Sequence, residues 1–237
     1  RLSAICDCRV IWGGDATISE IRRSPLKPRA IEMTFADRHS LLVVDADAYL
    51  QMDDKALAAR QFYNDTFLSD QNACTAPRII VWLGKHKQQA KEVFWKHIEE
   101  LAAKQYEIAP AQAVGKLHAA YKAAAYKPVR FQGGLGARNY RFQVEKLDPD
   151  LMDYKHNSGF FFEYDANELN EILPVCNEKC QTLTYIGVSR DDITEFIRTA
   201  APKGIDRVVS VGKSMDFGLV WDGYDLIRTL SRRYVIE

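Results

Sequence analysis

The chain has 237 residues, with 32 Lys+Arg against 32 Asp+Glu, a formal net charge of +0 and 47% hydrophobic residues. This length and composition indicate a soluble globular protein with a sizeable core, built as one large domain or two small ones. The balanced charge argues against a nucleic-acid or anionic-membrane partner, because no long stretch supplies a basic field. No apolar run is long enough to span a membrane.

Strand and helix patterns alternate along the chain. In chain order we expect a strand at 4–12, a helix over 16–23 with Asp15 as its N-cap, a strand at 40–45, a helix over 53–68, a strand at 78–83, helices over 87–105 and 110–125, a loop at 133–136, strands at 140–144, 159–164 and 181–188, a helix over 190–201 and a strand at 206–211. The run at 40–45 (SLLVVD) is apolar throughout, which is typical of a strand buried on both faces. The alternation predicts the α/β fold class with a largely parallel sheet.

The cysteines are Cys6, Cys8, Cys74, Cys176 and Cys180. An odd number without a secretory signal indicates thiols in a reducing compartment, and we expect a cytoplasmic protein. The pairs at 6 and 8 and at 176 and 180 raise a zinc site as the alternative. Because both pairs lack the usual two-residue knuckle gap, we predict thiols and no metal site.

Cys74 lies in a polar loop between a predicted helix and a predicted buried strand. Gln71, Asn72 and Thr75 surround it with hydrogen-bond donors. A thiolate at this position can attack a carbonyl carbon, and nearby N–H groups can hold the resulting oxyanion. We therefore predict Cys74 as a nucleophile, with Asn72 as an oxyanion donor or a support of the loop. The alternative is a small buried residue with no chemical role.

Four segments stand out in chain order: residues 10–15 (VIWGGD), 39–47 (HSLLVVDAD), 67–78 (FLSDQNACTAPR) and 170–175 (NEILPV). The third resembles the nucleophile segment of the aldehyde dehydrogenase superfamily, in which an amide residue and a small residue precede the cysteine. The first two are similar to the glycine turn that faces the cofactor and to the strand that ends in Asp-Ala-Asp. The last resembles the segment whose glutamate holds the nicotinamide ribose.

Within the superfamily, the likeness is greatest to the long-chain fatty acyl-CoA reductases of bacterial luminescence. It rests on the Trp-Gly-Gly-Asp turn, the Gln-x-Ala-Cys-x-x-Pro core and residues 216–227 (DFGLVWDGYDLI). Members of that family are much longer, so the resemblance implies that this chain is their C-terminal half, which fits the abrupt start at Arg1.

The resemblance also implies a domain organisation. We expect residues 1–36 to be the C-terminal end of a Rossmann-like nucleotide-binding domain and residues 37–225 to be an aldehyde-dehydrogenase-like catalytic domain that contains the cysteine. Residues 226–237 are expected to form a C-terminal tail that acts as an oligomerisation or domain-closing strand.

The departures from the superfamily bear on the reaction. Ordinary aldehyde dehydrogenases carry a glutamate that activates water to hydrolyse the enzyme thioester. Alignment on Ser40 places Phe35 at that position, and Glu32 lies three residues away. A reductase has to protect its acyl-cysteine from water until hydride arrives, so the loss of this base fits reduction to an aldehyde.

The resemblance implies NADPH as the cofactor, with Glu171 at the nicotinamide ribose and Gly13 and Gly14 at the pyrophosphate. It also implies an acyl-CoA or acyl-protein thioester substrate, acyl-transferase and acyl-protein synthetase subunits as partners, and a homo-oligomer. Two alternatives stay open: an ordinary or CoA-acylating aldehyde dehydrogenase, and an inactive C-terminal fragment of such an enzyme.

Overall fold

The structure is a computed structural model that describes residues 2–133 and 137–237. The chain divides into two compact units. The small unit comprises Arg1–Arg38 and Phe217–Glu237, and the large unit comprises His39–Asp216. The first boundary lies two residues beyond the one that we predicted. Residues 217–225 belong with the N-terminal segment, whereas the sequence had placed them in the cysteine domain.

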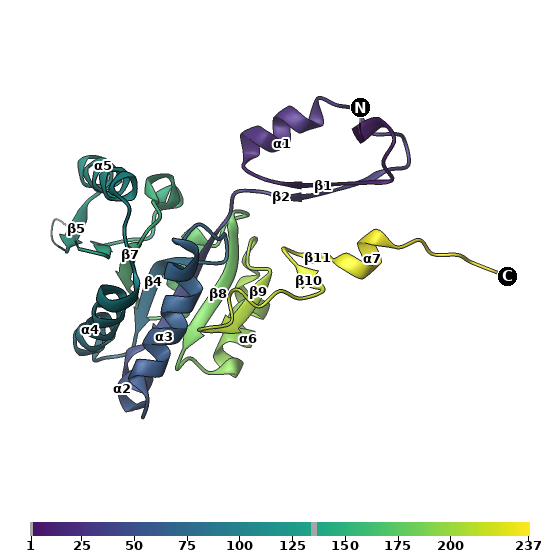
Figure 1. Ribbon diagram of the computed structural model, residues 1–237. Coiled ribbons are helices and arrows are strands. Elements are labelled where there is room, and N and C mark those ends of the chain that lie inside the picture. The colour runs from purple at the N-terminus through teal and green to yellow at the C-terminus, as the bar shows by residue number, and fades with distance from the viewer. Residues whose placement is uncertain (1, 134–136) are drawn as a thin grey trace. The chain divides into compact units, whose positions relative to one another are not determined.

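A mixed sheet forms the centre of the large unit (Figure 1). In spatial order its strands are β5 (Val129–Gln132), β6 (Tyr140–Val144), β7 (Phe160–Asp165), β4 (Pro77–Leu83), β3 (His39–Asp45), β8 (Cys180–Ile186) and β9 (Arg207–Ser210). Neighbouring strands run parallel, except that β5 pairs antiparallel with β6. The predicted α/β class with a largely parallel sheet is confirmed.

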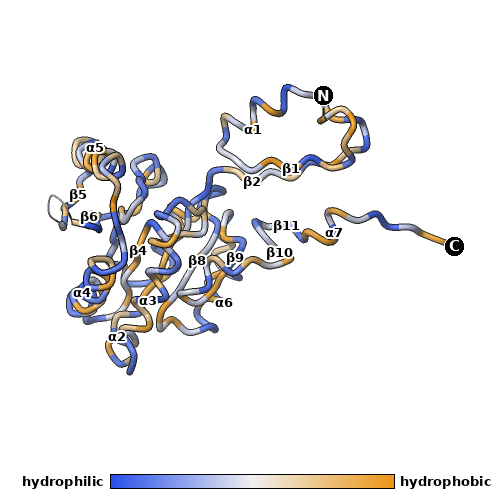
Figure 2. The backbone as a smooth tube through the Cα atoms, in the orientation of Figure 1, coloured by the Kyte–Doolittle hydropathy of each residue, from blue (hydrophilic) through white to orange (hydrophobic). Residues whose placement is uncertain are grey.

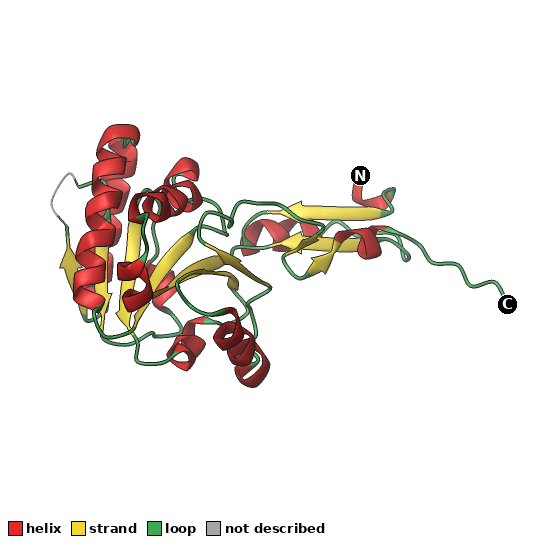
Figure 3. Ribbon diagram, turned by 90° about the horizontal axis from the view of Figure 1, so that it is seen from below, coloured by secondary structure: helices red, strands yellow, loops and turns green. Residues whose placement is uncertain are grey.

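Helices cover both faces of this sheet (Figure 3). One face packs against α2 (Ala46–Gln51), α3 (Lys55–Thr66) and α4 (Lys87–Gln105). The other packs against α5 (Pro110–Tyr126), α6 (Arg190–Ala200) and two 3-10 segments, η3 (Leu151–Tyr154) and η4 (Leu169–Val175). Figure 2 shows hydrophobic residues along the central strands. Because Leu41 and Val43 face one layer while Leu42 and Val44 face the other, β3 is buried on both sides, as its apolar run predicts.

Side-chain caps set where α2 and α3 begin. The Asp45 carboxylate accepts from the N–H of Ala48 at 2.9 Å and begins α2, a helix that the sequence analysis missed. Asp54 accepts from Leu57 at 2.8 Å, so α3 begins at residue 55 rather than at 53. These carboxylates satisfy N–H groups that have no partner within the helix. The predicted helix over 53–68 therefore becomes α3 followed by η2 (Phe67–Ser69).

Two tryptophans share one carboxyl group beneath α4. Glu163 of β7 is fully buried, and its Oε1 accepts from Trp95 Nε1 at 2.5 Å and from Trp82 Nε1 at 3.2 Å. Burial raises the pKa of Glu163 above its ordinary value, because an apolar environment disfavours the charged form. The two indole donors offset part of that cost and fix the rings of both tryptophans.

The small unit pairs β1 (Cys8–Trp12) in parallel with β2 (Ile31–Phe35), joined by α1 (Asp15–Arg22). Its C-terminal part holds β10 (Val220–Trp221), β11 (Tyr224–Asp225) and α7 (Leu226–Leu230), and a 3-10 turn, η1 (Leu2–Ala4), lies near the N-terminus. The small core combines Met33, Phe35 and Trp221. Arg38 pairs with Asp222 at 2.5 Å, which fixes residues 217–225 to the N-terminal segment.

The small unit differs from its predicted structure at the start of α1 and in the C-terminal tail. The N-cap of α1 is Gly14, and Asp15 is the first helical residue, where its carboxylate faces the positive end of the helix dipole. The tail predicted to form a strand is instead α7, followed by residues 231–237 without regular structure. The loop predicted at 133–136 lies outside the described residues except for Gly133.

Within the described part of the chain, no helix has both the length and the apolar character needed to cross a membrane.

Candidate active site

Cys74 lies in the loop between η2 and β4, at the edge of the sheet where the parallel strands begin. The residue is half-buried, whereas Thr75 to Arg78 behind it are buried. The loop therefore presents the cysteine at a surface backed by a rigid strand, which is how reactive side chains are commonly positioned.

The other cysteines have different surroundings. Cys176 and Cys180 lie in the hydrophobic core of the large unit. A hydrogen bond with Cys180, together with burial, raises the pKa of the Cys176 thiol far above its ordinary value. In the small unit, burial raises the pKa of Cys8. Raised pKa values keep a thiol protonated and a poor nucleophile. Within the large unit, Cys74 is therefore the cysteine that lies outside the core.

The backbone turns sharply just before Cys74. Asp70 and Gln71 both adopt left-handed conformations, with φ of 50° and 57°. The N–H of Gln71 donates to Thr66 O at 2.8 Å, and the N–H of Asn72 donates to Ser69 O at 2.8 Å. Left-handed backbone is costly for a residue such as glutamine and persists only where the surroundings enforce it.

The Gln71 side chain supplies that enforcement. It is fully buried, and its Nε2 donates to Pro77 O and Phe160 O, both at 3.0 Å. Its Oε1 accepts from Gly159 N at 3.1 Å and from Phe160 N at 2.9 Å. All four hydrogen-bonding positions of the amide are occupied. The place of Gln71 in the polar loop suggested that its side chain could donate to an oxyanion. Because its amide is fully occupied, the side chain instead joins the cysteine loop to β7.

Arg78 also connects the cysteine loop to the segment before β7. Its Nη2 donates to Gln71 O at 2.6 Å, and its Nη1 donates to His156 O at 2.7 Å. The Asn157 side chain donates to Asn72 Oδ1. Two of these contacts, Arg78 with His156 and Asn72 with Asn157, join the cysteine loop to the segment before β7. The role of Asn72 in the reaction stays a prediction.

Ser40 and Thr75 hold the loop from its other side. Ser40 Oγ donates to the backbone carbonyl of Cys74 at 2.7 Å and accepts from Thr182 N at 3.2 Å, so β3 and β8 both contribute. Thr75 Oγ1 donates to Met215 Sδ at 3.2 Å. This role of Ser40 was not predicted, and the signal that could have shown it is a serine at the start of an apolar run.

Glu171 lies at the opposite end of the sheet from Cys74. It follows β7, whereas Cys74 precedes the parallel strand β4. Its carboxylate accepts from the Tyr164 hydroxyl, from Asn167 N at 2.7 Å and from Glu168 N at 3.2 Å. The hydrogen bond from Tyr164, with the two N–H groups, holds the pKa of Glu171 below its ordinary value. The predicted contact of Glu171 with the nicotinamide ribose stays a prediction.

Gly13 and Gly14 form the predicted turn between β1 and α1 in the small unit. The N–H of Gly13 donates to Phe35 O at 3.1 Å, which fixes the turn to β2. A Cβ placed on Gly14 would meet no atom within 4 Å, so the space in front of α1 is open. Open space before a helix N-terminus fits a phosphate group, and the assignment of these glycines to the cofactor stays a prediction.

Neither residue near the expected position of the water-activating base is suited to that task. Phe35 is buried, and its ring stacks on Trp12 at a centroid distance of 4.7 Å. Glu32 pairs with Arg9 and with Arg22. Partial burial by itself raises the pKa of Glu32, but the hydrogen bonds from Arg22 and Arg9 outweigh it and hold the pKa below its ordinary value. A carboxylate with a low pKa is a weak general base.

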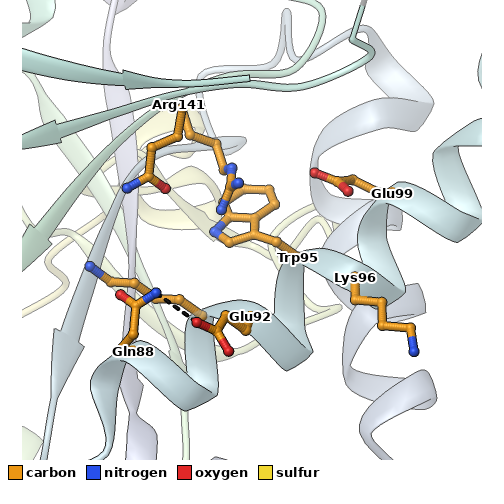
Figure 4. A pocket seen from close by; sticks show the side chains of 8 residues that line it. Gln88, Glu92, Trp95, Lys96, Glu99 and Arg141 are labelled. Carbon is orange, nitrogen blue, oxygen red and sulfur yellow. Dashed lines mark hydrogen bonds between the residues drawn. The ribbon is translucent and has the colours of Figure 1, made fainter. Parts of the chain in front are cut away.

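A separate pocket of about 250 Å³ lies between α4 and the strands β5 and β6 (Figure 4). The guanidinium of Arg141 lies over the Trp95 ring, 5.0 Å from its centroid, and Gln88 Nε2 donates to Glu92 Oε1 at 2.9 Å. The eight described residues that line this pocket are charged or amide side chains and one tryptophan, and no cysteine is among them. The loop of Cys74 is therefore the candidate active site.

Known proteins resemble the chain in sequence and in fold. Three solved structures share its fold: a 1-pyrroline-5-carboxylate dehydrogenase variant from Thermus thermophilus (TM-score 0.60, 13% identity, 94% of this chain and 49% of that chain), the Thermus enzyme with bound NAD (TM-score 0.57, 13% identity, 90% and 45%), and aldehyde dehydrogenase 21 from Physcomitrella patens (TM-score 0.63, 10% identity, 88% and 45%). The chain thus spans about half the length of these structures. No curated protein matches it.

The sequence comparison with protein families is more specific. The family model described as acyl-CoA reductase (LuxC) matches residues 1–233. The resemblance drawn from the cysteine segment is therefore confirmed: the chain has the aldehyde dehydrogenase fold and belongs to the acyl-CoA reductase (LuxC) family.

Proposed function

We propose that the full-length protein containing this chain reduces a long-chain fatty acyl thioester to a fatty aldehyde, through an acyl group carried on Cys74. The observation that carries the proposal is the half-buried Cys74 on a loop fixed at five points to the sheet and its neighbouring loops, in a chain of the acyl-CoA reductase family. A nucleophile held in a single orientation reacts faster, because its freedom of movement is lost before the reaction begins.

The first step transfers the acyl group. The Cys74 sulfur attacks the thioester carbonyl carbon, the bond to the coenzyme A sulfur breaks, and coenzyme A leaves as its thiol. We assign the oxyanion of the tetrahedral intermediate to backbone N–H groups of the loop and to the Asn72 amide. The acyl-enzyme keeps the oxidation state of the substrate, so this step needs no cofactor.

The second step is a reduction. The solved neighbours include one with bound NAD, and we propose a nicotinamide cofactor here, specifically NADPH; when bound, it supplies the hydride. Hydride addition and protonation turn the acyl-cysteine into a thiohemiacetal, which releases the aldehyde and restores the thiol. The chain's residues keep the acyl carbon oriented on the Cys74 loop during this step.

The surroundings of Phe35 and Glu32 favour reduction over hydrolysis. Phe35 has no ionisable group, and the Glu32 carboxylate is held by two arginines. A thioester without a nearby base is attacked slowly by water and persists until hydride arrives. The runner-up is an ordinary or CoA-acylating aldehyde dehydrogenase, which the fold alone equally accommodates.

The test follows the acyl group. The full-length protein is incubated with radiolabelled long-chain acyl-CoA, and the label is mapped to the peptide that contains residues 67–78. Addition of NADPH is expected to release the label as fatty aldehyde. Release as free fatty acid, with or without NADPH, would instead establish hydrolysis and the dehydrogenase. If the protein takes up no label, the proposed acyl transfer does not occur and the proposal is wrong.

A pair of glutamate variants tests where the cofactor binds. Glu178 is exposed and lines an open pocket with Pro149 and Lys203, so it serves as the control. We expect Glu171→Gln to raise KM for NADPH, because the family resemblance assigns this carboxylate to the nicotinamide ribose. We expect Glu178→Gln to leave this KM unchanged. Steady-state kinetics in which Glu171→Gln keeps the wild-type KM would remove Glu171 as the ribose ligand.

Acyl-transferase and acyl-protein synthetase subunits, a homo-oligomer and a cytoplasmic location stay predictions that follow from the family resemblance.

A further inference from the structure

Lys116 of α5 is buried, with 1% of its surface exposed. Its Nζ donates to three backbone carbonyls: Ala137 O at 3.1 Å, Arg138 O at 2.8 Å and Ser158 O at 3.0 Å. It also lies 4.5 Å from the centroid of the Tyr140 ring. An ammonium group has three N–H donors, and here each donor finds one carbonyl. Buried lysines are uncommon, and this one makes its hydrogen bonds to the backbone of two separate loops.

One of those carbonyls belongs to the segment that supports the cysteine loop. Ser158 adopts a left-handed conformation, with φ of 63°, and its N–H donates to Asp70 O at 2.9 Å. Gly159 follows with φ of 80° and donates to the Gln71 side chain. The peptide around Ser158 therefore contacts Lys116 through its carbonyl and the turn before Cys74 through its N–H groups.

Residues 137–138 are in direct contact with residues 158–159. A Cβ on Gly159 would lie 2.4 Å from Arg138 O, so the two segments touch without space between them. Lys116 reaches the carbonyls on both sides of this contact. The ammonium group thus joins residues 137–138 to residues 158–159, and the latter hold the turn that carries Cys74.

We propose that Lys116 is a positioning residue for the Cys74 nucleophile, acting through Ser158 and Gly159. It does not touch the substrate. The effect of Lys116 on acylation rests on the proposed function. Its structural role does not: the ammonium group fixes the backbone that supports the cysteine loop.

The charge of Lys116 matters for this task. Burial lowers the pKa of Lys116 to about 8. Below that pH the ammonium serves all three carbonyls. Above it the neutral amine has only two N–H donors, and one buried carbonyl loses its partner, which is costly in an apolar setting. Deprotonation is therefore expected to loosen the supporting loop as the pH rises through 8.

Other ionisable groups surround this site on each packed element. They are Tyr106 and Asp70, which hydrogen-bond to each other at 2.7 Å, Arg138, whose Nε donates to Tyr106 O at 2.8 Å, Tyr140 of β6, and His156, whose Nε2 lies 2.9 Å from a Cβ position on Gly115. Burial raises the pKa of Tyr106, so this group stays protonated across the range in which Lys116 titrates.

The experiment compares wild type, Lys116→Arg, Lys116→Met and the control Lys122→Met in the full-length protein. Lys122 lies on the same helix and is exposed. Single-turnover acylation of Cys74 by acyl-CoA is measured between pH 6 and 9.5. Thiol ionisation changes the absolute rate of both proteins with pH, so the two are compared at each pH. We expect the ratio of the Lys116→Arg rate to the wild-type rate to be constant below pH 7 and to rise above about pH 8. At pH 7, folded Lys116→Met is expected to acylate about 10- to 100-fold more slowly, and Lys122→Met to match wild type.

Two outcomes would overturn the assignment. One is a ratio of the Lys116→Arg rate to the wild-type rate that stays constant across pH 8, and the other is a folded Lys116→Met variant that acylates within twofold of wild type. If Lys116→Met does not fold, the pH dependence of the Lys116→Arg rate relative to wild type is sufficient to test the assignment.

A second readout separates this inference from the proposed function. Alkylation of Cys74 by iodoacetamide needs no acyl-CoA. The ratio of the Lys116→Arg rate to the wild-type rate is expected to be constant below pH 7 and to change across pH 8. A ratio independent of pH would contradict the role of Lys116, whereas a wild-type protein that is alkylated but never acylated would contradict only the proposed reaction.

Discussion

The Cys74→Ala variant is expected to lose both acyl labelling and aldehyde formation, with a fall in rate of roughly 10⁴-fold or more. The sulfur is the atom that forms the covalent intermediate, and no other described group on the loop is a comparable nucleophile. The fold should persist, because Ser40 holds this residue through its backbone carbonyl, which the substitution keeps. Rapid-quench measurement of label bound to protein, followed by NADPH addition, gives both quantities.

A matched cysteine variant provides the control for this loss. Cys8→Ala removes a thiol of the small unit whose pKa is raised by burial, and it should label like wild type. Retention of label in Cys74→Ala, or loss of it in Cys8→Ala, would remove Cys74 from the mechanism. Cys74→Ser is a further check: an oxygen ester formed at this position should resist reduction more than the thioester.

Replacing Gln71 with leucine is expected to lower the free energy of unfolding of the large unit by roughly 3–5 kcal/mol. Leucine has a similar size but leaves four buried backbone groups, at Pro77, Gly159 and Phe160, without their partner. It also withdraws the contacts that hold the left-handed turn. Urea unfolding is expected to show a lower midpoint with an unchanged slope, and acylation of Cys74 should fall as well.

The exposed residue Gln88 offers the comparison for this substitution. Its amide bonds only to Glu92 on the surface of α4, so Gln88→Leu should change the free energy of unfolding by at most about 0.5 kcal/mol. Equal midpoints for the two leucine variants would show that the buried hydrogen bonds of Gln71 contribute little and that the turn is held by other contacts.

Most of the sheet could be predicted from local patterns. The apolar runs that became β3 and β4 are buried on both faces, and such runs carry their own signal. Several elements escaped, among them α2 and β5 of the large unit. The helix α2 has six residues and depends on a single cap by Asp45, which is too short for a periodic signal. The edge strand β5 is mostly exposed and lacks an apolar pattern.

The site was predictable only where it is local in sequence. The segment that carries Cys74 is continuous, so its composition and its likeness to a family were enough to select it. The role of Gln71 was not accessible, because the backbone groups that occupy its amide come from residues 159–160, almost ninety positions later. Spacing likewise could not show that Glu171 emerges at the far end of a parallel sheet, since that depends on the direction of β7.

The distribution of the four tryptophans gives each unit its own optical signature. Trp82 and Trp95, which share the Glu163 carboxyl, belong to the large unit, while Trp12 and Trp221 belong to the small one. When Trp12 and Trp221 are replaced by phenylalanine, the remaining tryptophan emission arises from the large unit alone. Because Trp12 is 64% exposed and the other three are buried, the native spectrum combines one red-shifted emitter with three blue-shifted ones. The separate melting of each half can therefore be followed in the intact chain without an added dye.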